Sequence, residues 1–218
     1  MRALKYLHHT ILLGLLACPL RAQDAGSSAS AAPGDADAKR WSFYAAAAGY
    51  VIPHSRSYVS PTLTADRGWL HLEARYNYES LETGSLWGGY NFTLSEKVEL
   101  KLTPMLGGVF GKKTAMAPGY LGTFNYKGIA LFSQGEFVFD THERAGSFFY
   151  TWSELSYAPA GWFRAGIVAQ RTKAYQTELG IQRGFLAGLS HKKLDFTTYV
   201  FNLGWTDPTI VIALGVRF

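Results

Sequence analysis

The stretch that decides the fold is the last one, Pro208-Thr209-Ile210-Val211-Ile212-Ala213-Leu214-Gly215-Val216-Arg217-Phe218. Counting back from the terminal phenylalanine in steps of two meets only large apolar side chains, whereas the intervening positions are mostly small or charged. This alternation has the period of a β-strand, in which successive side chains point to opposite faces. The stretch is therefore predicted to form a two-faced strand.

A final strand that ends on an aromatic residue resembles the last strand of bacterial outer-membrane β-barrel proteins, a superfamily that includes small porins. The resemblance implies that Phe218, Val216 and Leu214 form the signal that the barrel-assembly machinery reads, which makes that machinery a partner. Alternation alone leaves two alternatives open. A soluble barrel or sandwich packs its apolar face inward, whereas a membrane barrel turns that face to lipid and lines its lumen with the polar face.

The composition favours the membrane alternative. Charged residues make up 17% of the 218-residue chain, and 48% of the residues are hydrophobic and 15% aromatic. A typical soluble domain carries roughly 25% charged residues, and a surface that faces lipid accounts for the shortfall. No apolar run approaches the roughly 18 residues that a membrane-spanning helix needs, which disfavours a helical membrane protein.

The first 22 residues are predicted to be a secretory signal peptide, which implies Sec export. Together with the resemblance to outer-membrane barrels, it gives the bacterial outer membrane as the expected final location. Arg2 and Lys5 form its basic start, and an apolar core follows at residues 11–17. Cys18 lies inside this segment, in a context that loosely resembles a lipobox, but Pro19 follows directly. We therefore favour ordinary cleavage over lipidation of the cysteine.

Residues 23–40 consist mainly of small and polar side chains, so we expect a flexible periplasmic tail. From residue 41 to 218, alternating segments of about ten residues are separated by turn residues, which is typical of transmembrane barrels. We predict an all-β fold, an antiparallel transmembrane β-barrel of about twelve strands, with ten or fourteen as alternatives and both termini in the periplasm. The expected strands are residues 41–52, 58–65, 68–79, 86–94, 98–110, 120–126, 129–139, 148–157, 162–172, 178–190, 194–203 and 208–218.

The inward face of these strands is predicted to be charged. In residues 68–79 the odd positions are mostly charged or polar and the even positions apolar, which places Trp69 and Glu79 in the lumen and Tyr78 against lipid. The predicted lumen lining is His71, Glu73, Arg75, Glu99, Lys101, Glu136, Glu154, Arg164, Glu178 and Arg217, together with the bulky Trp87, Tyr150, Trp152 and Tyr199. We favour ion pairs that stabilise a narrow barrel over a charged selectivity lining. Parity places Glu154 opposite Arg164 or one diagonal step away, within contact distance.

The connections between strands are short. The expected periplasmic turns are Asp66-Arg67, residues 95–97, Lys127-Gly128 and His191-Lys192, and the expected outer loops include residues 111–118 and 141–146. Loops of this length make it improbable that a long inward-folded loop constricts the lumen. Basic residues gather at the outer ends, where they either contact lipopolysaccharide phosphates or form a solvated rim. They are Arg56, Lys112, Lys113, Arg144, Lys173 and Arg183.

The sequence leaves two function classes open. The favoured one is a narrow passive pore or a structural membrane protein with a charged, largely filled lumen. The alternative is a hydrolase of lipids or acyl chains at the outer rim, where Asp140, His142 and Ser147 flank one loop. Such residues are ordinary loop composition, so we predict no enzyme. The isolated histidines predict no metal site, and we expect no cofactor.

The net charge excludes a nucleic-acid partner. The formal charge of +5 includes three basic residues of the signal segment, and without them 18 basic side chains face 16 acidic ones. That balance, and the lack of a basic cluster interleaved with aromatic residues, is not typical of nucleic-acid binding. The expected partners are outer-membrane lipid and lipopolysaccharide, and the sequence gives no indication of the oligomeric state.

Overall fold

The computed structural model describes residues 40–53, 55–95, 98–142, 146–174, 180–204 and 208–218. Their strands form one antiparallel sheet in which β1 (Ser42–Val51) pairs both with β2 (Tyr58–Arg67) and with β13 (Thr209–Arg217). The strands between them are β3 (Leu70–Tyr76), β4 (Thr83–Tyr90), β5 (Phe92–Ser95), β6 (Leu100–Gly111), β7 (Ala115–Tyr126), β8 (Ile129–Asp140), β9 (Phe148–Ala160), β10 (Phe163–Ala174), β11 (Gly180–His191) and β12 (Leu194–Phe201). Within these ranges, no helix is long and apolar enough to cross a membrane.

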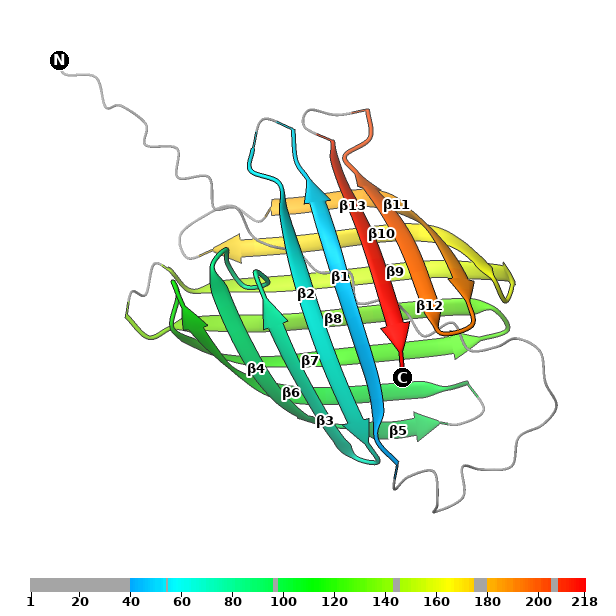
Figure 1. Ribbon diagram of the computed structural model, residues 1–218, viewed down its shortest axis with the longest axis horizontal. Helices are drawn as coiled ribbons and strands as arrows, with labels where there is room; N and C mark the ends of the chain where they lie inside the picture. The colour runs from blue at the N-terminus through cyan, green and yellow to red at the C-terminus, as the bar shows by residue number, and fades with distance from the viewer. Residues whose placement is uncertain (1–39, 54, 96–97, 143–145, 175–179, 205–207) are drawn as a thin grey trace.

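The sheet closes on itself. Both β4 and β5 pair with β6, so they are two halves of one strand interrupted at Asn91. The 13 segments of the described residues therefore make a barrel of twelve strands, closed where β1 meets β13. In Figure 1 these two strands lie side by side and cross in front of β6 to β10. The predicted antiparallel barrel of about twelve strands is confirmed.

The barrel has two different ends. At the end where β1 begins and β13 finishes, which we call the terminus end, turns at residues 68–69, 127–128, 161–162 and 192–193 join the strands. At the opposite end, the loop end, the described connections include residues 77–82, 112–114 and part of 141–147. The predicted signal peptide with Cys18 lies outside the described residues, as does all of the predicted tail except Arg40.

The outer surface is an apolar belt with an aromatic girdle at each end. Every second residue of β13 from Ile210 to Leu214 is exposed, while Val211 and Ala213 are buried. Exposed aromatic residues at the terminus end include Trp41, Phe43, Trp69, Tyr90, Phe92, Tyr126, Tyr157 and Trp162, and those at the loop end include Tyr76, Phe110, Phe137, Phe139 and Phe149. An apolar band between two aromatic girdles is the surface that transmembrane barrels present to lipid.

The turns show where alternation is a weak guide. Tyr126 pairs with Ile129 across Lys127-Gly128, as predicted. Three predicted turns are wrong. His191 pairs with Leu194 across Lys192-Lys193, β2 meets β3 across Gly68-Trp69, and Ser95 of the expected 95–97 turn lies in β5 and pairs with Leu100. Positive φ angles of 54° at Lys192 and 56° at Gly68 reverse the chain there, and they move the turn toward the chain's C-terminus in both hairpins. Trp69 consequently lies exposed in a turn and not in the lumen.

The expected outer loop at residues 111–118 is also shorter than predicted. Strand β7 starts at Ala115, and Val109 of β6 pairs with it. The connection is therefore a tight one of three residues, 112–114. Pro118 lies inside β7 with an exposed side chain, opposite Leu106.

Candidate functional site

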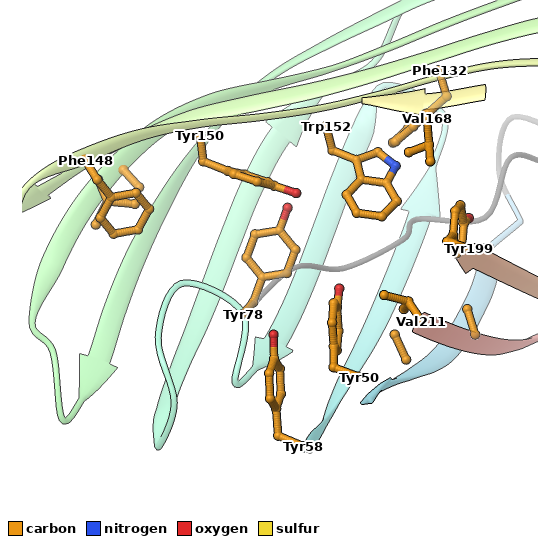
Figure 2. Close-up of a cluster of buried hydrophobic side chains, with 14 of the residues drawn as sticks. Tyr50, Tyr58, Tyr78, Phe132, Phe148, Tyr150, Trp152, Val168, Tyr199 and Val211 are labelled. Atoms are coloured by element: carbon orange, nitrogen blue, oxygen red, sulfur yellow. The ribbon is translucent and has the colours of Figure 1, made fainter. Parts of the chain in front are cut away.

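The inside of the barrel is packed with side chains. Trp152, Tyr199 and Glu154 are each 0% exposed, and Tyr50 and Tyr150 are each 1% exposed. Figure 2 shows these aromatic rings converging from opposite walls, with Tyr50 and Tyr58 side by side. The two rings stack with their centroids 4.6 Å apart. Most of the described inward positions are buried, so the interior is filled rather than lined.

The loop at residues 77–82 turns back into the barrel. Strand β3 ends at Tyr76 because Asn77 takes a positive φ of 55°, and the Asn77 amide donates a hydrogen bond to the Thr83 carbonyl (2.8 Å). The Asn77 Oδ1 atom accepts from the Glu82 amide (2.8 Å), which closes the loop on itself. Tyr78 and Glu79 are thereby carried into the lumen, where each is 2% exposed.

This loop corrects the prediction for Tyr78. Tyr78 was expected to face lipid, but the break in alternation at Asn77 turns it inward. The expectation that no long loop folds inward is not contradicted, since this loop has only six residues, but the loop does place two side chains inside the lumen. Figure 2 shows Tyr78 reaching across toward Tyr150, and the two rings meet edge to face with centroids 6.1 Å apart.

Arg75 of β3 lies at the centre of an acidic cluster. Its guanidinium donates from Nε and Nη2 to the two carboxylate oxygens of Glu73 (2.8 and 2.9 Å) and from Nη1 to Glu136 (2.9 Å). An oxygen of a third carboxylate, that of Glu79, lies 3.8 Å from the same Nη1 atom. We call Glu73, Arg75, Glu79 and Glu136 the Arg75 collar.

Aromatic rings sandwich the same guanidinium. Its carbon lies 4.2 Å from the centroid of Tyr78 and 4.5 Å from that of Trp87. Gln134 donates from Nε2 to the Tyr78 hydroxyl. Gly107 makes room for the indole, since a Cβ at that position would lie 2.4 Å from an atom of the Trp87 ring.

Glu79 is the loop's own contribution to the collar. Its Oε1 atom accepts hydrogen bonds from Ser85 Oγ (2.6 Å) and Trp87 Nε1 (3.2 Å). Burial raises the pKa of the Glu79 carboxyl above its ordinary value, and the charge of Arg75 opposes that rise. The other carboxylate oxygen of Glu79 and the Oε1 atom of Glu136 are buried without a hydrogen-bond partner among the described residues.

A second ionic cluster joins β9, β10 and β12. The Arg164 Nη1 atom donates to Glu154 Oε2 (3.2 Å), and its Nη2 atom donates to Thr197 Oγ1 (2.9 Å). The Oε1 atom of Glu154 accepts from Trp152 Nε1 (2.8 Å) and from the Tyr199 hydroxyl (2.9 Å). The predicted contact of Glu154 with Arg164 is therefore present.

The register behind that contact differs from the expectation. Glu154 lies opposite Val168 rather than opposite Arg164, and the pairing shifts at a β-bulge between Phe163 and Ala165. The guanidinium spans the additional distance along the barrel, which a long side chain allows. Neither predicted pairing, direct or one diagonal step away, is correct.

Two further polar groups lie toward the terminus end. Arg217 Nη2 donates to Asp195 Oδ2 (2.6 Å), whose other oxygen accepts from Ser190 Oγ (2.7 Å). His71 Nδ1 lies 2.8 Å from Asp66 Oδ1, and its Nε2 atom lies 3.5 Å from a carboxylate oxygen of Glu73. His71 therefore links Asp66 to Glu73 of the Arg75 collar.

Three predicted lining residues do not belong to the packed interior that the structure describes. Glu99 lies in the turn before β6, with a φ of 42°, and not on the strand. Lys101 has the parity of the buried Thr103 but is exposed near the terminus end of β6. Glu178 lies outside the described residues. The missed residue Tyr78 had one signal in the sequence, the Asn77 that favours a left-handed turn.

The residues considered for a hydrolase are not arranged as a catalytic triad. Ser147 Oγ accepts a hydrogen bond from the Asp140 backbone amide (3.1 Å), whereas the exposed His142 ring has Thr141 Oγ1 at 3.2 Å from Nδ1. No bond between the serine and the histidine is present in the described part of this loop. In the described ranges, no group of three or more His, Cys, Asp or Glu is arranged to hold a metal ion.

The basic residues of the loop end are partly neutralised. Glu82 lies 3.5 Å from Arg56 and 3.9 Å from Lys112, in contacts that are exposed to solvent. Lys113 lies 3.5 Å from Asp140. Arg183 is exposed on β11, whereas Arg144 and the side chain of Lys173 lie outside the described part of the chain.

The barrel is similar to solved structures of porins. The KdgM porin shows a TM-score of 0.58 at 11% identity, and the match covers 80% of this chain and 99% of that one. The NanC porin shows a TM-score of 0.57 at 9% identity, covering 79% of this chain and 98% of that one. A second KdgM structure, in complex with disordered oligogalacturonate, shows 0.58 at 10% identity over 80% and 99% of the two chains. No protein-family model matches the chain, and no curated protein matches its sequence.

Proposed function

We propose that the protein is an integral outer-membrane β-barrel that acts as a narrow passive pore with a charged, largely filled lumen. The observation that carries the proposal is the set of ionic groups inside the barrel, among them Arg75, Arg164, Glu136 and Glu154. Removing ions from water costs several kcal/mol per ion, and apolar side chains would often fill a dry interior at lower cost. Charges in these positions therefore favour a lumen that admits water when it works.

The likeness in fold to the KdgM and NanC porins supports the same proposal. Twelve strands give a barrel in which large inward side chains leave only a narrow passage. We place the terminus end in the periplasm and the loop end at the cell surface, since short turns on the periplasmic side are usual in such barrels.

A structural membrane protein is the second candidate. It is favoured by the burial of the aromatic residues that cross the lumen, since Trp152 and Tyr199 are each 0% exposed. A barrel that remained filled in this way would stabilise the membrane or present its loops without conducting.

Planar-bilayer recording of the refolded protein separates these candidates. We expect stepwise currents from the wild-type barrel and larger steps from Trp152→Ala, because that substitution removes the largest fully buried ring. Silence from both proteins, when each migrates as a folded, heat-modifiable band, would contradict the pore and support the structural candidate. Currents that are equal in both would show that Trp152 does not narrow the passage.

We also propose the partners that the belt and the last strand imply. The outward apolar belt contacts membrane lipid, and the exposed basic side chains at the loop end contact lipopolysaccharide phosphates. Sec export through residues 1–22 is followed by recognition of Phe218, Val216 and Leu214 by the assembly machinery. The Phe218 amide also donates to the Phe43 carbonyl (3.0 Å) at the closing seam. Deleting Phe218 is therefore expected to lower the amount of heat-modifiable barrel in outer-membrane fractions, and an unchanged amount would contradict this role.

A further inference from the structure

The inward loop and the Arg75 collar occupy the same level of the barrel. Tyr78 and Glu79 come from the loop and Glu136 comes from β8. The Arg75 guanidinium lies between them. All four side chains are 5% exposed or less. Whatever crosses the barrel must therefore pass or displace this set of side chains.

The collar carries more acid than base. Three carboxyls face one guanidinium, and the nearest further basic group is His71, 3.5 Å from Glu73. Arg75 binds Glu73 through two donors and Glu136 through one, whereas its approach to Glu79 is looser, at 3.8 Å. An excess of acidic groups therefore remains after the arginine is neutralised.

Two oxygens of the collar point to a ligand. Glu79 Oε2 and Glu136 Oε1 are buried and have no hydrogen-bond partner among the described residues. A buried carboxylate oxygen without a donor is costly, so each is available to a cation or to water that enters the lumen. Rings of acidic side chains are the lining that favours cations in channels.

We infer that the loop at residues 77–82 and the Arg75 collar form the constriction of the proposed pore, and that this constriction passes small cations in preference to anions. The inference rests on the proposed pore function and adds the class of permeant solute. The collar acts as a selectivity lining. The rings of Tyr78 and Trp87, which already pack on a guanidinium, also tolerate an organic cation.

Reversal potentials in a potassium chloride gradient test the charge. The measurement is made in an alkaline buffer, because burial raises the pKa of Glu79 and a higher pH favours its ionised form. We expect a severalfold preference of the wild-type pore for potassium over chloride, which falls toward unity in the double variant Glu79→Gln with Glu136→Gln. Glu82→Gln is the matched control, since Glu82 lies on the same loop but is exposed and pairs outside the lumen. A chloride preference in the wild type, or an unchanged ratio in the double variant, would overturn the inference without contradicting the proposed pore function.

Shortening the loop tests the constriction. Asn77 already bonds to Thr83 across the hairpin, so residues 78–82 can be replaced by an Asn-Gly turn, which suits a two-residue hairpin. We expect larger current steps from this variant than from the wild type. Equal steps in the two folded proteins would overturn the constriction without affecting the pore. Silence of both folded barrels would overturn the pore and the inference together.

Discussion

The contact between Arg164 and Glu154 predicts a specific pattern of stabilities. Replacing Arg164 by methionine removes the donor to Glu154 Oε2, while Oε1 keeps its bonds from Trp152 and Tyr199. Because Glu154 is 0% exposed, the remaining carboxylate is left buried without a counter-charge, and its Oε2 atom loses the bond from Arg164. Breaking a buried ion pair from one side costs about 3–5 kcal/mol, and we expect Arg164→Met to lower the free energy of unfolding by that amount.

The double variant Glu154→Gln with Arg164→Met is expected to be milder. Glutamine is neutral, and its amide oxygen still accepts from Trp152 and Tyr199, so the stranded charge is relieved while the network is kept. The double variant should therefore be more stable than Arg164→Met alone by about 1–3 kcal/mol. Urea unfolding in lipid vesicles, followed by tryptophan fluorescence, measures all four proteins of the cycle. Simple additivity of the two single changes would refute the reasoning.

Two further predictions each compare a substitution with a control substitution at a second position. Gly107→Ala should lower the free energy of unfolding by about 1–3 kcal/mol, because its Cβ would overlap the Trp87 ring, whereas Gly108→Ala meets nothing within 4 Å and should be neutral. The same urea titration would contradict the packing if the two variants were equally stable. Ile212→Arg, in the middle of the outward face of β13, should cost about 2–4 kcal/mol, and Leu194→Arg, at the terminus end of β12, about 0–1 kcal/mol. Equal costs in vesicle unfolding would show that lipid does not meet Ile212.

The strand count and the faces of most strands could be predicted from alternation. In the last strand the exposed Ile210, Ile212 and Leu214 and the buried Val211 and Ala213 follow the predicted faces. Period-2 alternation specifies which side a residue takes, because a one-residue slip would turn every side chain to the opposite face. Alternation therefore gives the correct faces for each strand that has no bulge and no break.

Register and loop geometry could not be predicted in the same way. A slip of two residues keeps every face, so alternation does not distinguish a turn at His191-Lys192 from the observed turn at Lys192-Lys193. The position of the turn is decided by the positive φ at Lys192. Lysine gives no turn signal in a sequence, whereas the glycine at position 68 does. Tyr78 was predicted to face lipid because the alternation in the sequence continues past Asn77, although the backbone has already turned at that residue.

We expect the faces of this barrel to be inverted relative to those of a soluble barrel, with lipid outside and a filled lumen within. The most direct test is spin labelling of single cysteines introduced in turn at residues 209–216 of the refolded mature barrel in vesicles, with oxygen and a water-soluble nickel chelate as relaxing agents. We predict high oxygen accessibility at Ile210, Ile212 and Leu214 and low accessibility to both agents at Val211 and Ala213. High nickel accessibility at Ile210, Ile212 and Leu214, or accessibility without a two-residue period, would contradict the account.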